Sequence, residues 1–319
     1  MKKLLISTVL ASLLASSAAF ATNNPTSKEV NKQTVAQAKS DAENHQVKLL
    51  KESVEALLLT QKTLVDLAKN QKDLAIKDLE KAIGKLEVVL ASKDVPALLP
   101  VETRVVVYEY LGDLKTLLKA INEVKILIAA NKLQDARVLL DTLRSELVIS
   151  TVSIPLATYP DALKLAAKYL HEGKTKEAIE VLETALNTLV ETQVVIPLPI
   201  IKAEGLIKAA SLLAETDREQ ALKHLEQAKK ELVIAQTLGY VSTSSTTYKM
   251  LKEAIEEIEK EIKGKNPVAK LFEELLNKIK EFKEKATKQT SSAPAPQAAK
   301  AEPKAEGNTT AAKEANTTK

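Results

Sequence analysis

The sequence predicts an all-α protein: four stacked antiparallel helical hairpins, a repeat-like bundle, followed by C-terminal helices and a disordered tail. Only 7 of the 319 residues are Gly, and 28% are charged, a composition typical of helical proteins. Apolar residues recur at steps of three and four along most of the chain, which places them on one face of a helix. The phrase Ile-Pro-Leu occurs at Ile154 and again at Ile196, and this spacing suggests a repeated structural unit.

The first residues predict export. Lys2 and Lys3 precede a short apolar run, and Ala19-Phe20-Ala21 supplies the small residues that a signal peptidase reads. We therefore expect a signal peptide at residues 1–21, cleaved after Ala21, because the run is shorter than the roughly 20 apolar residues that span a bilayer. An uncleaved anchor is the alternative. The chain has no Cys, so a lipid anchor on Cys is excluded, and we expect a periplasmic protein without a membrane span.

The charge of the chain argues against nucleic acid as a partner. The formal net charge is +4, and loss of Lys2 and Lys3 with the signal peptide reduces it to +2. Binding to phosphate backbones requires a basic excess, which this near-neutral balance does not provide.

Four hairpins are predicted after a polar leader at residues 22–46, which we expect to be partly helical. They begin near Val47, Val101, Pro160 and Ile200. Val105, Val106 and Val107 form a β-branched run that allows a short strand, but the periodic face after it favours helix, and we predict helix throughout. Together the hairpins define a domain at residues 47–240. Residues 248–285 are predicted as accessory amphipathic helices, and residues 286–319 as a tail too polar to order itself.

Prolines and one glycine mark the predicted corners between hairpins. A helix cannot continue through Pro155 or Pro197, because proline lacks the N–H that the helix needs and restricts the residue before it. Pro160 and Pro199 follow at the same corners, and Gly173 stands where a left-handed helix cap is expected.

The return helices of the hairpins resemble one another. Ala136, Leu140 and Leu143 match Ala178, Leu182 and Ala185 at an offset of 42 residues, the distance between Pro155 and Pro197. Stacked hairpins of this kind bury a continuous core that none buries alone. The segment from Gly173 to Leu186 is also similar to a tetratricopeptide helix, although the period exceeds that family's usual length of about 34 residues. We interpret this similarity as a consequence of the way any two helices pack in a hairpin, and not as membership of the tetratricopeptide family.

No pattern of catalytic, cofactor-binding or metal-binding residues stands out. His45, His171 and His224 lack the spacing of a metal site, and the chain has neither a Gly-rich phosphate loop nor a nucleophile elbow. We therefore predict a protein that is not an enzyme and has no cofactor.

Two residues are candidate contacts for a partner or ligand. Arg144 occupies a position that Leu186 holds in the next repeat, so its charge requires a carboxylate such as Glu146 or Glu102, or a place at the rim of the core. Tyr159 lies between prolines, where its hydroxyl either meets a ligand or fixes the corner to the core.

Several phrases resemble the YfdX family in their order along the chain. They are Leu139-Leu-Asp-Thr-Leu-Arg-Ser-Glu-Leu-Val148, Ile154-Pro-Leu-Ala-Thr-Tyr-Pro160, Ala185-Leu-Asn-Thr-Leu-Val190 and Val195-Ile-Pro-Leu-Pro199. The resemblance covers roughly Val47 to Tyr240. It implies a bacterial, exported, helical protein associated with acid and envelope stress, for which chaperone-like activity has been proposed. The family has no established catalytic residues to carry over, and the helices after Tyr248 depart from it.

These observations favour a non-enzymatic stress-associated protein that binds other proteins, including unfolded ones, or associates with itself. A binder of small amphipathic molecules, with a cleft between hairpins near Tyr159 and Pro197, is the first alternative. An enzyme of unknown type is the second, because the groups that catalysis requires are not visible in the sequence.

Overall fold

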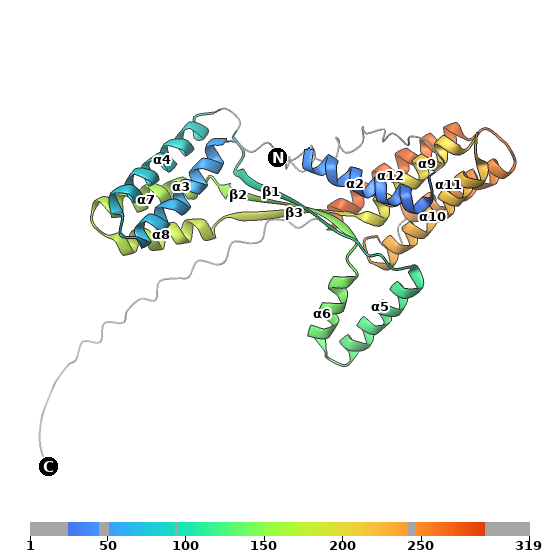
Figure 1. Ribbon diagram of the computed structural model, residues 1–319, viewed down its shortest axis with the longest axis horizontal. Coiled ribbons are helices and arrows are strands. Elements are labelled where there is room, and N and C mark those ends of the chain that lie inside the picture. The colour runs from blue at the N-terminus through green and yellow to red at the C-terminus, as the bar shows by residue number, and fades with distance from the viewer. Residues whose placement is uncertain (1–24, 45–50, 93–94, 242–245, 291–319) are drawn as a thin grey trace, which may run out of the picture.

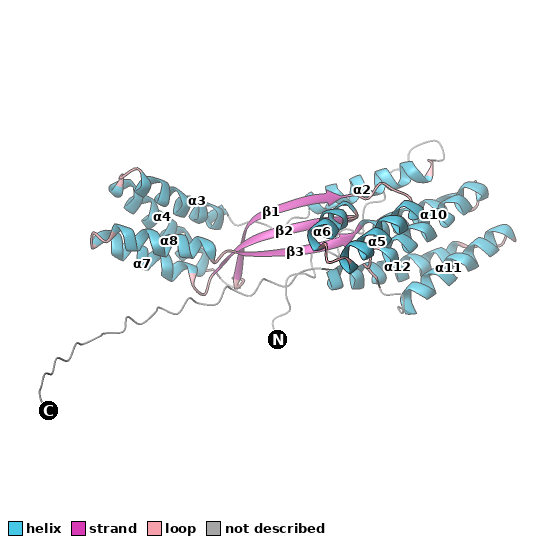
Figure 2. Ribbon diagram, turned by 90° about the horizontal axis from the view of Figure 1, so that it is seen from below, coloured by secondary structure: helices cyan, strands magenta, loops and turns pink. Residues whose placement is uncertain are grey.

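The computed structural model describes residues 25–44, 51–92, 95–241 and 246–290. Across these ranges the chain forms eleven helices and one three-stranded antiparallel sheet. The sheet lies between two groups of helices, and a further helical hairpin projects from it (Figures 1 and 2). The protein is mostly helical, but the prediction of an all-α fold is wrong because of this sheet.

The sheet is a meander whose two connections are helical hairpins. Its strands are β1 (Leu98–Tyr108), β2 (Glu146–Pro155) and β3 (Val190–Pro197), in the order β1-β2-β3. Tyr108 pairs with Glu146 at one end of the β1–β2 ladder, and Ser153 pairs with Val190 at the opposite end of the sheet. Successive connections therefore leave the sheet at opposite ends.

The strands arise from β-branched runs that the sequence reading assigned to helices. Val105 to Val107 lie in β1, Val148 to Val152 in β2, and Val194 to Ile196 in β3. Branched side chains fit the pleated surface of a sheet better than the crowded surface of a helix. Pro155 and Pro197 consequently end strands, not helices, because proline cannot donate to the next ladder bond.

One end of the sheet carries a four-helix bundle. It consists of α3 (Lys51–Ala68), α4 (Lys72–Leu90), α7 (Tyr159–His171) and α8 (Thr175–Asn187). α4 contacts α7 and α3 contacts α8, so each hairpin covers the apolar face of the other. The core of the bundle contains fully buried leucines at Leu79, Leu163, Leu170 and Leu182.

Gly173 and Pro160 shape the α7–α8 hairpin as predicted. Gly173 has a φ of 81°, in the left-handed region, and the N–H of Lys174 donates to the carbonyl of Tyr169 at 2.8 Å. This hydrogen bond is the closing bond of a Schellman cap. Pro160 lies in the first turn of α7, where the missing N–H costs nothing because that turn has no acceptor for it.

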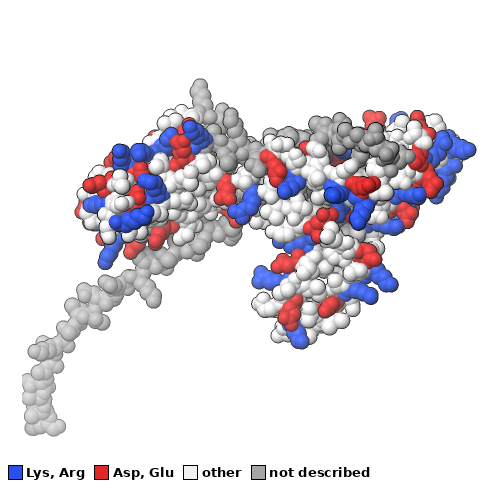
Figure 3. Space-filling model, viewed as in Figure 1, with Lys and Arg blue, Asp and Glu red and all other residues white. Residues whose placement is uncertain are grey.

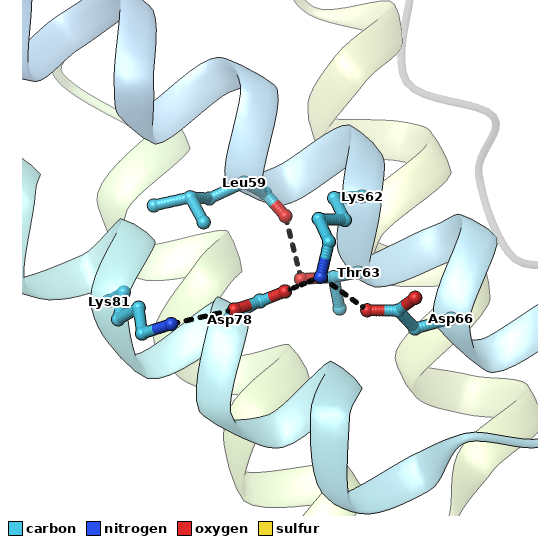
Figure 4. A network of polar contacts seen from close by, with 6 residues as sticks. All are labelled: Leu59, Lys62, Thr63, Asp66, Asp78 and Lys81. Carbon is cyan, nitrogen blue, oxygen red and sulfur yellow. Dashed lines mark hydrogen bonds and ion pairs between the residues drawn. The ribbon is translucent and has the colours of Figure 1, made fainter.

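A polar network joins α3 to α4 inside this bundle (Figure 4). The Lys62 ammonium binds the Asp78 carboxylate and lies 3.2 Å from Asp66, while Lys81 lies 3.0 Å from Asp78. Asp66 and Asp78 are buried. The hydrogen bond from Lys62, aided by Lys81, outweighs burial and lowers the pKa of Asp78.

The other end of the sheet carries a larger helical group centred on α9 (Leu198–Leu213). Around it lie α2 (Ser27–Asn44), α10 (Arg218–Thr237), α11 (Thr246–Lys263) and α12 (Ala269–Thr290). The first three turns of α9 are buried nearly all round, as expected for a helix at the centre of a core. Pro199 lies in the first turn of α9, as Pro160 does in α7.

Two close contacts hold the terminal helices on α9. Gly205 faces Thr34 of α2, and a Cβ at this glycine would overlap the Thr34 side chain, so only glycine permits the approach. Lys283 of α12 donates to buried Glu204 at 2.5 Å, and Lys208 donates to the same carboxylate at 2.7 Å. Burial opposes ionisation of Glu204, but the two lysines prevail and lower its pKa.

The structure shifts several of the predicted boundaries. Most of the predicted leader, residues 27–44, is the packed helix α2, and the accessory helices correspond to α11 and α12. Helix α12 continues to Thr290, so the first residues of the predicted tail are helical. The predicted signal peptide, its cleavage after Ala21 and the tail from residue 291 onwards lie outside the described residues.

The remaining hairpin is formed by α5 (Leu114–Ala129) and α6 (Leu133–Thr142), and it connects β1 to β2. All four predicted hairpins therefore exist, but they do not stack in one row. The strands between them place α3–α4 and α7–α8 at one end of the sheet, and α5–α6 and α9–α10 at the other. We call the α5–α6 hairpin the arm, since it projects away from the sheet (Figure 1).

Candidate protein-binding arm

The arm is a complete antiparallel hairpin with its own local signals. The Asp113 carboxylate caps α5 by accepting the N–H of Thr116 at 2.7 Å. At the tip of the arm Asn131 has a φ of 57°, which asparagine tolerates better than most residues. The N–H of Lys132 then donates to the carbonyl of Leu127 at 2.9 Å and closes the turn. These bonds define the backbone of the arm without a neighbouring element.

The interior of the arm is small. Leu117 and Val124 of α5 and Ala136 of α6 are its buried side chains, together with Leu143 at its base. The exposed large apolar side chains outnumber them, with exposed fractions between 45% and 68%. They are Leu118, Ile126, Ile128, Leu133, Val138 and Leu140.

Exposure on this scale distinguishes the arm from the α7–α8 hairpin. Within α7–α8 the exposed large apolar side chain is Leu165, whereas Leu163, Leu170 and Leu182 are fully buried. In the space-filling view, uncharged surface runs along the arm between charged side chains at its edges (Figure 3). An apolar surface with a polar border is characteristic of protein–protein interaction sites.

A cluster of polar side chains fixes the base of the arm to the body. The Arg144 guanidinium lies 3.7 Å above the ring of Tyr108 and donates from Nε to the Glu146 carboxylate at 2.8 Å. The Tyr240 hydroxyl donates to the other oxygen of Glu146 at 3.1 Å and accepts the N–H of Ser145 at 3.0 Å. Burial raises the pKa of Tyr240, so its hydroxyl keeps the proton that it donates.

Glu109 provides a second link between the arm and the body. It stands between β1 and α5, and its carboxylate lies 2.8 Å from the ammonium of Lys202 on α9. Lys202 is only 7% exposed. The exposed arm is thus attached to the body through partly buried charged contacts, which hold its direction.

Arg144 is therefore a residue of the base of the arm. Of the two alternatives for its charge, a carboxylate partner or a place at the rim of the core, the structure shows a pair with Glu146, while the Arg144 side chain stays 35% exposed. Glu102, the other candidate, pairs with Arg104 at 3.0 Å. The guanidinium is covered by the Tyr108 ring and held by Glu146, so its contacts are internal.

Tyr159 lies far along the chain from the arm, at the start of α7. Its side chain is fully buried in the core of the four-helix bundle, and this burial raises its pKa to about 12. The placement supports its role in fixing the corner to the core. A ligand would have to enter the bundle to reach the hydroxyl.

The structure corrects one arm position that the sequence comparison placed on a buried face. Leu140 matches the core residue Leu182 in the repeat, but it is 45% exposed. One signal was present in the sequence of α5. Leu117, Leu118, Ile126, Leu127 and Ile128 occupy more of the helix circumference than one stripe needs, which indicates a second apolar face.

Two other kinds of site are absent from the part of the chain that the structure describes. Across these ranges, no three His, Cys, Asp or Glu side chains gather in a way that could hold a metal ion. None of the helices in the same ranges is both long enough and apolar enough to cross a membrane.

Residues 56–195 match the model of the family described as YfdX protein. This part of the chain is a YfdX region. The match runs from within α3 to within β3, so the YfdX region contains the arm, most of the four-helix bundle and nearly all of the sheet. Helix α2 and helices α9 to α12 lie outside the matched region. The resemblance noted in the sequence is thereby confirmed.

A solved crystal structure of YfdX from Salmonella Typhi is similar to part of this chain. The two sequences are 14% identical, the TM-score is 0.35, and the alignment covers 47% of this chain and 93% of that chain. No curated protein matches this chain.

Proposed function

We propose that this chain is an exported, non-enzymatic protein that binds apolar segments of other proteins on its α5–α6 arm. The observation that carries the proposal is the exposure of large apolar side chains on the arm, at 68% for Val138, 60% for Ile126 and 57% for Leu133. A monomeric protein rarely presents so many such side chains on one element without a partner.

The nature of the surface favours partners that lack a fixed shape. The exposed apolar side chains are distributed over both helices of the arm, so a partner can contact them in more than one arrangement. Lysines at positions 115, 119 and 125 alternate with the apolar side chains of α5 and keep the surface hydrated when it is unoccupied. An unfolded or partly folded chain exposes apolar segments in many arrangements. Such segments can bury the exposed apolar side chains of the arm. A second copy of this protein is the competing occupant.

A client-aggregation assay tests the proposal. The full mature chain is mixed with thermally unfolding citrate synthase, and light scattering is followed at neutral and acid pH. We expect the unaltered protein to slow the aggregation. The double variant Ile126→Ser/Val138→Ser should lose most of this protection, because it removes two of the exposed apolar side chains.

The matched control is Val88→Ser/Leu212→Ser, which removes side chains that are 61% and 63% exposed on other helices. It should protect the client as the unaltered protein does. Equal protection by both double variants would contradict the proposal, as would an absence of protection by the unaltered protein. If the arm variant instead changes only the mass of the protein in light-scattering chromatography, the arm is a self-association surface.

A further inference from the structure

A second feature of the molecule is a cleft beside the base of the arm. It is formed by α2, the segment between β1 and α5, and α10, and it encloses about 1040 Å³. Lys202 and Glu231 lie in its lining and are buried, although both carry titratable groups. This volume is at the upper end of the range for small-molecule sites, about 300–1,000 Å³.

The charges around the cleft have an excess of one sign. Six lysines line it, against the three acidic residues Glu109, Asp113 and Glu231. Each acid is already engaged within the protein: Glu109 pairs with Lys202, Asp113 caps α5, and Glu231 accepts a hydrogen bond from Asn31 at 2.9 Å. Burial also raises the pKa of Glu231 and disfavours its negative charge.

Three of the lysines form no close ion pair. Lys28 and Lys32 lie one turn apart on α2, and Lys115 is in the first turn of α5 across the cleft. Among the described residues none of the three forms an ion pair within 4.0 Å. Lys115 lies close enough to Asp113 to help lower the pKa of that carboxyl, whereas Lys28 and Lys32 have no such acidic neighbour in the described ranges, so these two lysines leave a positive potential at the mouth of the cleft.

The walls between these charges are apolar. Val35 of α2, Leu114 of α5 and Ile234 of α10 contribute to them. An inorganic anion would pair with the lysines but make no apolar contacts with these walls. A neutral apolar molecule would contact the walls but offer no negative charge to the lysines. A molecule that satisfies both has an apolar body and an anionic end.

We propose that this cleft binds an amphipathic organic anion, with its apolar body between α2 and α10 and its carboxylate at Lys28, Lys32 and Lys115. The sequence suggested a cleft for amphipathic molecules near Tyr159 and Pro197; the cleft described above lies elsewhere, at the base of the arm, and contains neither residue. This site does not depend on the proposed protein binding by the arm, so either can fail alone.

Decanoate is a suitable probe, because it combines one carboxylate with an apolar chain. Titration calorimetry and thermal melting of the full mature protein should show decanoate binding below its critical micelle concentration, with a melting temperature that rises with ligand concentration. Acetate and decyltrimethylammonium, which each lack one of the two required features, should not bind. Binding of decyltrimethylammonium as tight as that of decanoate would overturn the proposal.

Two charge-reversal variants locate the site. Lys28→Glu/Lys32→Glu should weaken decanoate binding about tenfold, which corresponds to two exposed charge contacts. Lys69→Glu/Lys77→Glu reverses two exposed lysines on the four-helix bundle and should leave the affinity unchanged. Because all four lysines are exposed, neither variant is expected to unfold the protein.

The arm variant Ile126→Ser/Val138→Ser serves as the last control. It should bind decanoate as the unaltered protein does, even if it no longer protects a client. Loss of decanoate binding in the arm variant but not in the Lys28→Glu/Lys32→Glu variant would place the ligand on the arm and overturn the proposed site.

Discussion

The arm and the α7–α8 hairpin are two versions of one unit with different surroundings. Each connects neighbouring strands, and their second helices match residue by residue: Ala136 with Ala178, and Leu140 with Leu182. Both alanines are buried, but Leu182 is fully buried whereas Leu140 is 45% exposed. The same amphipathic pattern therefore ends in a packed core in one hairpin and on the surface in the other.

The reason for the difference lies in what else reaches each end of the sheet. The α7–α8 hairpin meets α3–α4 and shares a core with it. The hairpin nearest to the arm along the sheet is α9–α10, whose apolar faces are already covered by α2, α11 and α12. An amphipathic pattern thus predicts an apolar face that is stable only when buried. The topology of the fold determines whether another element of the same chain buries it.

The largest difference in stability is expected when the leucines at matching positions of the two hairpins are each truncated to alanine. Leu182→Ala should destabilise the protein by about 2–5 kcal/mol, because it leaves a cavity in the bundle. Leu140→Ala should cost about 0.5 kcal/mol or less, as is usual for an exposed position. Urea denaturation of both variants measures the two values. Equal costs would mean that the arm is packed in solution.

A smaller effect is expected at the base of the arm. Tyr240→Phe removes the hydroxyl that bonds Glu146 and the N–H of Ser145, and should cost about 1–2 kcal/mol. Tyr169→Phe in the α7–α8 hairpin changes a partly exposed tyrosine and serves as the control. Limited proteolysis should cut the arm of the Tyr240→Phe variant faster. An unchanged cleavage rate would show that the hydroxyl does not hold the arm.

The smallest expected effect is on the pH dependence of stability. Its sign is opposite for the buried carboxyl groups at the two ends of the sheet. Burial raises the pKa of Glu231, while Lys202 nearby opposes the shift and Glu109 reinforces it. At pH values between the pKa of Glu231 in the unfolded protein and its higher pKa in the folded protein, the folded protein binds more protons. The contribution of this group to the free energy of unfolding therefore falls as the pH rises. Glu231→Gln should therefore raise the melting temperature at pH 7 by about 1–3 °C, and the gain should disappear below about pH 4.

Asp78 in the four-helix bundle provides the contrast. Its pKa is lowered by Lys62, so its stabilising contribution is present above the ordinary Asp pKa of 3.8 and is lost as pH falls through the folded pKa. Asp78→Asn should accordingly lower the melting temperature at pH 7, and the deficit should shrink in acid. Melting curves between pH 3 and 8 compare the two variants, and slopes of the same sign would refute the assignment.

Much of this fold is predictable from local pattern. The hairpins were predicted because their apolar periodicity spans whole helices, and the cap at Gly173 because few residues adopt a positive φ. The repeat of 42 residues is also real, since Pro155 and Pro197 both end strands. Each repeat is a helix followed by a strand, although the sequence reading assigned both parts to one helix.

The errors come from interactions that local pattern does not contain. Leu147 and Val148 continue the apolar spacing of α6, so only their pairing with β1 and β3 shows that they belong to a strand. The exposure of Leu118 and Leu140 depends on which helices occupy the neighbouring space. The carboxylate partner of Arg144 could be proposed from the sequence, because a charge on an apolar stripe requires a partner in any fold. Glu146, two residues away, was one of the candidates.

The pairing of Tyr108 with Glu146 makes the arm a replaceable cassette. These two residues face each other in the ladder, so the arm leaves and rejoins the sheet at adjacent points. A short turn grafted between them would close the same meander. The register of the sheet therefore does not depend on the length of the connection at this position.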